Sequence, residues 1–327
     1  MKKLVAIEVS REAIRAAEIA NPMSKNPKVV KIGEIDLPPG VAGESQVVEI
    51  DTFVSSLKEL WEKEKFSTKS VALVVSGRRF IIREHETTHT NMKQLRSVMS
   101  FELANVVPEQ MTNPIIDFYP MRHNETKTGI RTTGLVIATP ADPIETLIGA
   151  LIRAELKIEF VDYAPMAVSR FIRNFMKHDE DHDTYALANV RELSTDILIA
   201  ENNVPKMIRV APAGLPPKAR KRGRRVREED TGLDSSISVS EQSPIEQLAN
   251  EINKTIELQN RELGLTINKL YVTGSRSDKE TMEELQKLVK ADIIPLSAGS
   301  ALHNDSINHE FSASDFVAVC AGMRGKK

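Results

Sequence analysis

Hydrophobic residues along the chain follow two patterns, short continuous runs and longer stretches with helical spacing. Continuous runs rich in β-branched residues predict buried strands. We expect such strands at residues 3–9, 14–20, 29–37, 70–76, 80–84, 115–121, 131–138, 158–163, 185–190, 196–200, 207–211, 269–273 and 293–294. Spacings of three and four residues predict amphipathic helices. We expect these at residues 51–65, 91–107, 143–156, 165–176, 244–263, 279–290 and 311–324.

The order of these elements indicates two α/β halves that begin alike. Each half starts with strands joined by a short turn and continues into a helix, and a further unit is inserted in the first half. We predict a first domain over residues 1–182, with an inserted subdomain at about 79–157, and a second domain over 183–310. The last helix, 311–324, is expected to pack back on the first domain.

Residues 216–243 interrupt the second half and contain almost no hydrophobic side chains, which predicts a disordered insertion. Within it, residues 218–227 hold seven basic residues in ten, and three acidic residues follow directly. Such a run binds phospholipid head groups or nucleic acid through charge, or remains a solvated loop. The sequence therefore predicts contact with anionic lipid as one role of Lys218–Arg227, and no sequence-specific recognition of nucleic acid.

Composition narrows the class of protein. Among 327 residues, 44 Lys and Arg balance 46 Asp and Glu, so the chain as a whole is not built to bind a polyanion. Aromatic residues make up only 5%, which argues against a stacking surface for single strands. The single cysteine, Cys320, excludes an intrachain disulfide and indicates an intracellular protein. No apolar run is long enough to span a bilayer.

Three chemical motifs have simpler explanations. His85-Glu86-Thr87-Thr88-His89 matches the zinc-peptidase pattern, but that chemistry needs a helix and the motif follows a predicted strand. The acidic, histidine-containing stretch 178–183 fits a solvated turn better than a metal site. Cys320 lies on the apolar face of the last helix, so we expect a buried thiol and not a nucleophile. We therefore predict no metal site and no catalytic residue.

Five short sequence segments lie at residues 6–19, 74–77, 101–118, 156–162 and 270–275. Together and in this order, they resemble PilM-type type IV pilus assembly proteins, which are relatives of FtsA in the actin/Hsp70 superfamily. Their order covers nearly the whole chain apart from the insertion. The resemblance implies an actin-like (ribonuclease H-like) two-domain ATPase fold, with a small α/β subdomain inserted in the first domain.

The resemblance also implies two hairpin turns that hold nucleotide phosphates, and here both turns depart from the family. Such turns use glycine, because backbone N–H groups must approach the phosphates closely. In the first turn the usual Asp is Glu8, the Gly is Ser10 and a hydroxyl position is Glu12. In the second turn the Asp is Asn189 and the Gly is Arg191.

The resemblance also implies a pair of glycines beside the adenosine of a bound nucleotide. The corresponding residues here are Gly274 and Ser275. If nucleotide binding is retained, the resemblance places it on Ser10, Arg11, Arg15, Asn189, Gly274 and Ser275. Glu12 and Glu192 add negative charge beside a triphosphate. We therefore predict a pseudo-ATPase without cofactor, and the alternative is an ATP-binding protein whose nucleotide state gates partner binding.

Family members bind the short cytoplasmic tail of a PilN-type membrane protein, in a groove between the first domain and its inserted subdomain. The resemblance thus implies a cytoplasmic scaffold held at the inner membrane by partner proteins, among them pilus motor or platform proteins. The groove candidates are Phe80, Ile82, Met92, Leu95 and Met99. The cytoplasmic domain of a type II secretion scaffold and, more distantly, a zinc peptidase are the competing hypotheses.

Overall fold

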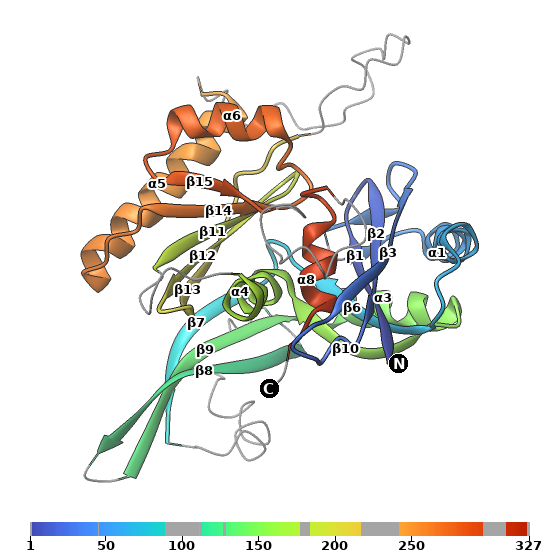
Figure 1. Cartoon of the computed structure of the whole chain (residues 1–327), viewed down its shortest axis with the longest axis horizontal. Helices are drawn as coiled ribbons and strands as arrows, with labels where there is room; N and C mark the ends of the chain where they lie inside the picture. Colours follow the sequence, from blue (N-terminus) through green and yellow to red (C-terminus); the bar gives the residue numbers. More distant parts are fainter. Residues whose placement is uncertain are drawn as a thin grey trace.

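The fold was analysed in a computed structural model of the 327-residue chain. The structure describes residues 2–44, 46–88, 111, 113–126, 129–176, 184–216, 242–296 and 312–325. Three sheets carry the architecture, and we call them the N-terminal sheet, the arm sheet and the C-terminal sheet (Figure 1).

The N-terminal sheet has the strand order β10-β6-β1-β2-β3. Its strands are β1 (Lys3–Val9), β2 (Ala13–Ala20), β3 (Lys28–Asp36), β6 (Ser70–Val75) and β10 (Lys157–Tyr163). β1 pairs in parallel with β6 and antiparallel with β2, so the sheet is mixed. A two-residue pair, β4 (Ala42–Gly43) and β5 (Gln46–Val47), lies beyond β3 along the chain.

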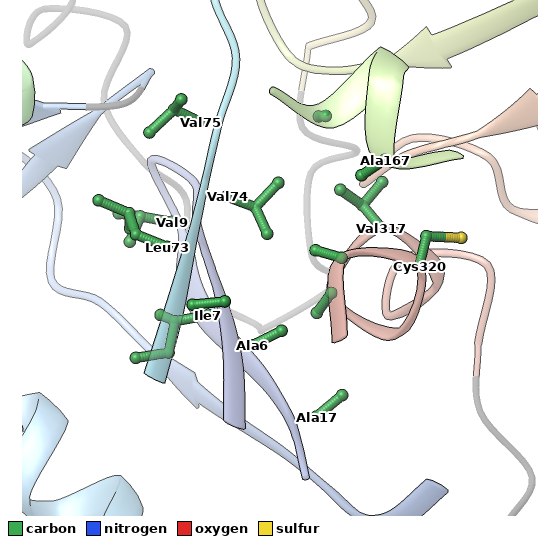
Figure 2. Packing of buried hydrophobic residues seen from close by; sticks show 14 of the residues in the cluster. Ala6, Ile7, Val9, Ala17, Leu73, Val74, Val75, Ala167, Val317 and Cys320 are labelled. Atoms are coloured by element: carbon green, nitrogen blue, oxygen red, sulfur yellow. The ribbon is translucent and has the colours of Figure 1, made fainter. Parts of the chain in front are cut away.

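Helices cover both faces of this sheet (Figure 1). α1 (Ile50–Glu64) and α3 (Ala141–Arg153) lie on one face, and α4 (Ala164–Phe175) and α8 (Phe316–Gly322) lie on the other. Figure 2 shows Val317 and Cys320 of α8 beside Ala167 of α4, close to Ala6 and Ala17 of the sheet. These side chains are almost fully buried, because apolar surface on every element is removed from water at this contact.

The C-terminal sheet repeats the same plan with the order β13-β12-β11-β14-β15. Its strands are β11 (Tyr185–Val190), β12 (Thr195–Glu201), β13 (Val204–Ala211), β14 (Lys269–Thr273) and β15 (Asp292–Pro295). α5 (Pro244–Leu263) and α6 (Lys279–Leu288) pack against each other on one side of this sheet, and α4 packs on the sheet as well. α4 therefore lies between the two large sheets.

The arm sheet has the order β7-β9-β8, with β7 (Ile81–Thr87), β8 (Pro114–Thr126) and β9 (Gly129–Pro140). The β8–β9 hairpin extends away from the rest of the molecule (Figure 1). β8 is the end strand of this sheet and β10 is the end strand of the N-terminal sheet. Each of these two strands therefore has a single strand partner among the described residues.

The alternation of apolar runs and helical spacings predicted the described elements except the two-residue strands β4 and β5, and the other differences lie at the ends of elements. Asp51 does not cap α1, because the helix starts earlier, after Glu49. Asp51 lies in the first turn and pairs with Arg153. The last helix spans only Phe316–Gly322, shorter than the predicted 311–324, because residues 313–315 form a turn. Cys320 is fully buried, as predicted.

Several predictions fall outside the described residues. They are the helix at 91–107, the turn at 178–183 and nearly all of the insertion at 216–243, including the basic run 218–227. At the end of the insertion, Ser243 and Glu246 form a capping box that starts α5. The strands of the two large sheets lie on either side of the predicted boundary at 182, and the domain limits themselves stay a prediction. No described helix is long and apolar enough to cross a membrane.

Candidate functional site

The β1–β2 turn is closed by its own serine. The Ser10 hydroxyl oxygen accepts hydrogen bonds from the backbone N–H groups of Glu12 (3.3 Å) and Ala13 (3.1 Å). The backbone N–H of Ser10 in turn donates to the Ala13 carbonyl at 3.0 Å. A phosphate-binding turn offers such N–H groups to its ligand. Here a side chain of the turn itself has taken two of them.

Arg191 occupies the corresponding position in the β11–β12 turn and is buried. Its guanidinium lies 2.9 Å from a carboxylate oxygen of Asp196 and 3.3 Å from one of Glu44. Asn189 donates its side-chain amide to Asp196 at 3.1 Å, and Asp196 is fully buried. An aspartate at 189 would instead set two buried carboxylates against each other, which accounts for the amide at this position.

The segment that follows β14 packs on the same turn. Gly274 has a φ of +109°, and a Cβ atom there would overlap the carbonyl of Val190 and the side chain of Asn189. Glycine is therefore required here by the close approach of two protein segments. The backbone N–H of Arg276 donates to the Val190 carbonyl at 3.2 Å, and the Ser275 hydroxyl donates to Glu192 at 2.8 Å.

Charged side chains connect the two turns across the cleft. Arg276, from the C-terminal side, lies 2.6 Å from Glu12 of the first turn and 3.6 Å from Glu192. Glu44, which follows β4, accepts from the Ser194 hydroxyl at 2.9 Å besides its contact with Arg191. These contacts join residues as many as 264 positions apart in sequence.

Glu8, on β1, lies within the electrostatic reach of both turns and is almost fully buried. Burial raises the pKa of its carboxyl to about 7, which the positive charges of Arg15 and Arg191 oppose and the nearby Glu192 and Asp315 reinforce. Burial also raises the pKa of Asp196, again against Arg191. Arg15 donates to Glu34 at 3.1 Å and reaches the Ser10 hydroxyl at 3.5 Å.

Several polar groups at the two turns already bond to one another. Two amides of the first turn already bond to Ser10, and the Arg191 amide donates to the Ser194 carbonyl at 3.1 Å. Carboxylates also outnumber guanidinium groups. The carboxylates are Glu8, Glu12, Glu44, Glu192, Asp196 and Asp315, and the guanidinium groups are Arg15, Arg191 and Arg276. Burial raises the pKa values of Glu8 and Asp196, and Arg78 lies 3.8 Å from Glu44, so the charge of this region is more nearly balanced than that count suggests.

A second hollow lies between the N-terminal sheet and the arm sheet, and we call it the groove. It encloses a volume of about 600 Å³ between the end strands β8 and β10 and the helices α3 and α4. Its apolar lining includes Phe80, Ile115, Ile116, Ile144, Ile148, Val161, Tyr163 and Met166. Ile115 and Val161 remain 42% and 38% exposed, unlike the core residues of the same strands.

Charged groups line one side of the groove. Asp162 is bonded by Arg170 at 2.5 Å and by Arg324 at 3.4 Å, and the Arg324 guanidinium lies 4.1 Å above the Phe160 ring. Arg173 donates to the Tyr119 hydroxyl at 3.4 Å. The groove thus combines apolar anchor surface with arginine side chains, a common arrangement where proteins bind peptides.

Only part of the predicted groove wall can be placed. Phe80 lines the groove and stacks on Tyr163 with ring centroids 4.5 Å apart, while Ile82 packs half-buried against the hydrophobic core. Met92, Leu95 and Met99 lie outside the described residues. The predicted contacts of all five with a partner stay predictions.

The zinc-peptidase hypothesis fails on local geometry. His85, Glu86 and Thr87 belong to strand β7, not to a helix, so successive side chains point to opposite faces. Glu86 pairs with Arg131 at 2.6 Å, and His89 lies outside the described residues. Within the described part of the chain there is no group of three His, Cys, Asp or Glu side chains that could hold a metal ion.

Comparison with known proteins bears on this architecture. The family model described as type IV pilus assembly protein PilM matches residues 6–209, more than half of the chain. The chain belongs to the PilM family. The match includes the first turn, the arm sheet and the second turn, so the departures at Ser10 and Arg191 lie inside the family region. A search of curated proteins found no match.

Solved structures place the PilM-family chain in the actin-like fold. A structure titled "PilM-PilN type IV pilus biogenesis complex" is 16% identical, with 98% of each chain covered and a TM-score of 0.75. The cytoplasmic domain of EpsL from Vibrio cholerae, a component of the type II secretion system, is 9% identical over 98% of this chain and 94% of that chain. Its TM-score is 0.49.

Sequence reasoning missed most residues that build the two sites in this PilM-family protein. Glu44 and Arg276 lie in connecting segments that no motif marks, and Ile115, Val161 and Arg170 come from three different elements. A signal existed in the strands, since an apolar residue on the outward face of an end strand is unusual. Arg11, a predicted nucleotide ligand, is exposed and lines a cavity of about 390 Å³ with Arg78 and Arg79, and Glu44 and Leu193 line the same cavity.

Proposed function

We propose that this chain is a scaffold in type IV pilus assembly whose groove binds the cytoplasmic tail of a PilN-like membrane protein. The groove carries the proposal, because Ile115 and Val161 expose apolar surface at a hollow between two sheet edges. Membership of the PilM family supports the pilus role, and the similar solved structure is a complex of PilM with PilN. The scaffold then acts at the cytoplasmic face of the membrane, held there by its partner.

An extended tail suits this groove physically. β8 and β10 each have one strand partner in the described part of the chain, so the backbone of a peptide can add to either edge. Alternate side chains of that peptide would enter the apolar pocket beside Met166 and Ile148. A polar or acidic group of the tail would meet Arg173, which lies at the groove beside Tyr119.

The scaffold works without ATP hydrolysis in this proposal. What supports this is the cleft, where Ser10 and Arg191 replace the expected glycines and bond to neighbouring groups. The competing function is an ATP-binding protein whose nucleotide gates the groove. Calorimetric titration with Mg-ATP separates the two, since micromolar binding would favour the gated protein.

The proposal is tested by titrating the purified chain with a synthetic peptide of the cytoplasmic tail of a PilN-like protein from the same pilus system. Ile115→Asp is expected to weaken tail binding tenfold or more, which is about 1.4 kcal/mol. Ile130→Asp is the matched control, because Ile130 is equally exposed, at 45%, on β9 near the tip of the same hairpin. Equal affinities of the two variants, or no binding to the unaltered chain, would overturn the proposal.

A further inference from the structure

The cleft between the two turns contains a chain of contacts that crosses from one large sheet to the other. We call Glu12, Glu44, Arg191, Glu192, Asp196 and Arg276 the interdomain network. Glu12 and Glu44 follow strands of the N-terminal half, and the other members follow or belong to strands of the C-terminal half. We propose that the interdomain network holds the two halves closed in place of a bound nucleotide.

The first argument is position. The network joins the β1–β2 turn to the β11–β12 turn and to the segment after β14. The family resemblance implies that a retained nucleotide would be held by these three segments, through residues such as Ser10, Asn189 and Gly274. Arg276 bridges Glu12 and Glu192, one from each turn, so a positive side chain of the protein lies between the two turns.

The second argument is burial. The side chains of Arg191, Glu192 and Asp196 are 6%, 4% and 0% exposed, and Glu44 is 10% exposed. Water screens such pairs poorly, and removing one partner leaves a buried charge without compensation. Opening the cleft would separate Glu12 from Arg276 and Glu44 from Arg191 together. Of these two pairs, Glu44–Arg191 is the buried one, with side chains 10% and 6% exposed, whereas the Glu12 side chain is 39% exposed. The Glu44–Arg191 pair is therefore the one that water screens least.

The third argument concerns a second contact between the two halves, which is made by α4. α4 lies between the two large sheets, and Ser169 on this helix bonds to the Tyr185 hydroxyl of β11 at 3.2 Å. This packed contact lies away from the turns, so it leaves the mouth of the cleft to be closed by the network. Loss of the network then allows the halves to rotate about α4 while the fold of each half is kept.

The proposal predicts how the distance between the halves responds to charge reversal. Two spin labels would be attached at Lys58→Cys on α1 and Glu284→Cys on α6, both exposed helix positions. The native Cys320 is fully buried and remains unlabelled. Pulsed electron paramagnetic resonance then gives the distribution of distances between the halves.

Arg276→Glu gathers three glutamates in the cleft and is expected to shift the distribution to longer distances by more than its original width. The double variant Arg276→Glu, Glu12→Arg exchanges the two charges, and it is expected to reverse most of the shift to longer distances. Lys279→Glu is the matched control, because Lys279 pairs with Glu283 on the surface of α6 with 92% of its side chain exposed. If Arg276→Glu does not fold, Glu12→Gln, at a half-exposed site, should give a smaller shift in the same direction.

Adding Mg-ATP to the unaltered chain tests whether a nucleotide, and not the interdomain network, sets the distance between the halves. The proposal expects the same distance distribution with and without it. A distribution that narrows or shifts on addition of Mg-ATP would overturn the proposal, and so would an Arg276→Glu chain with an unchanged distribution. The measurement uses the chain alone, so its outcome does not depend on whether the groove binds a tail.

Discussion

The cleft and the groove differ in how far the chain satisfies its own side chains. In the cleft, Arg191 is bonded by Asp196 and Glu44, and Ser10 accepts from two amides of its own turn. In the groove, Ile115 and Val161 remain more than one third exposed beside strands that lack a second partner among the described residues. The cleft therefore pairs many of its charges internally, although buried atoms such as Glu8 Oε2 and Asn189 Oδ1 have no hydrogen-bond partner in the described part of the chain. The groove has apolar surface left to bind a partner.

This difference separates two uses of one fold. A site that binds a polar ligand must keep donors and acceptors unpaired until the ligand arrives, at a cost in stability. The cleft combines internal ion pairs with a few unpaired buried groups, among them Arg191 Nε and Asp315 Oδ1. The groove has kept exposed apolar area, which is the usual mark of a protein-binding surface.

The largest expected effect comes from removing the arginine at the centre of the cleft. Arg191→Ala leaves Asp196 and Glu44 buried without their partner, so the free energy of unfolding should fall by about 3 to 5 kcal/mol. Arg209→Ala is the control, because its pair with Glu251 is roughly one third exposed and should contribute under about 1 kcal/mol. Urea denaturation of both variants measures the difference, and equal losses would mean that the cleft charges are no more tightly coupled than surface ones.

A smaller effect should depend on pH through Glu8. The folded-state pKa of about 7 exceeds the usual value of 4.5, so the folded chain binds more protons than the unfolded chain between these values. Stability is therefore expected to fall as pH rises from 5 to 8, on the order of 2 kcal/mol from this group.

Glu8→Gln removes that contribution, since an amide does not ionise. Relative to the unaltered chain, the variant should gain stability at pH 8 and show little change at pH 5. The groups that face Glu8, namely Arg15, Arg191, Glu192 and Asp315, are the same in both proteins. Parallel stability profiles of the two proteins between pH 5 and 8 would contradict the prediction.

The smallest effect concerns Tyr163, which belongs to both regions. Its ring stacks on Phe80 in the groove, while its buried hydroxyl has no hydrogen-bond partner among the described residues and lies within the electrostatic reach of Asp196 and Arg191. Tyr163→Phe removes an unsatisfied group, so stability should rise by about 1 kcal/mol. Tail binding should stay unchanged, and a loss of stability in thermal unfolding would show that the hydroxyl is bonded.

The sequence predicted the strands and helices because burial and periodicity are local properties. The run at Lys3–Val9 and the spacing of Phe53, Leu57 and Leu60 are sufficient to identify a buried strand and an amphipathic helix. Ser10 and Arg191, at positions where the family resemblance implies glycine, could also be named from the sequence. The replacement contacts were not visible, because Glu12 and Arg276 are 264 positions apart and only the folded chain brings them together.

The groove was harder to predict for a related reason. Phe80 could be proposed from its place after a predicted strand, but Ile115, Val161 and Met166 line the same hollow from β8, β10 and α4. No spacing in the sequence connects these elements. Their common wall arises from the packing of two sheets at an angle that a linear pattern does not encode.

The serine hydroxyl in the first turn has a consequence for any search for ligands. Because Ser10 is tethered two and three residues from the amides it binds, it competes at an effective concentration far above that of a dissolved nucleotide. A compound designed on the phosphates of actin-like ATPases would have to displace a group that cannot diffuse away. Inhibitors of this pilus component are therefore better sought among peptides that imitate a bound tail than among nucleotide analogues.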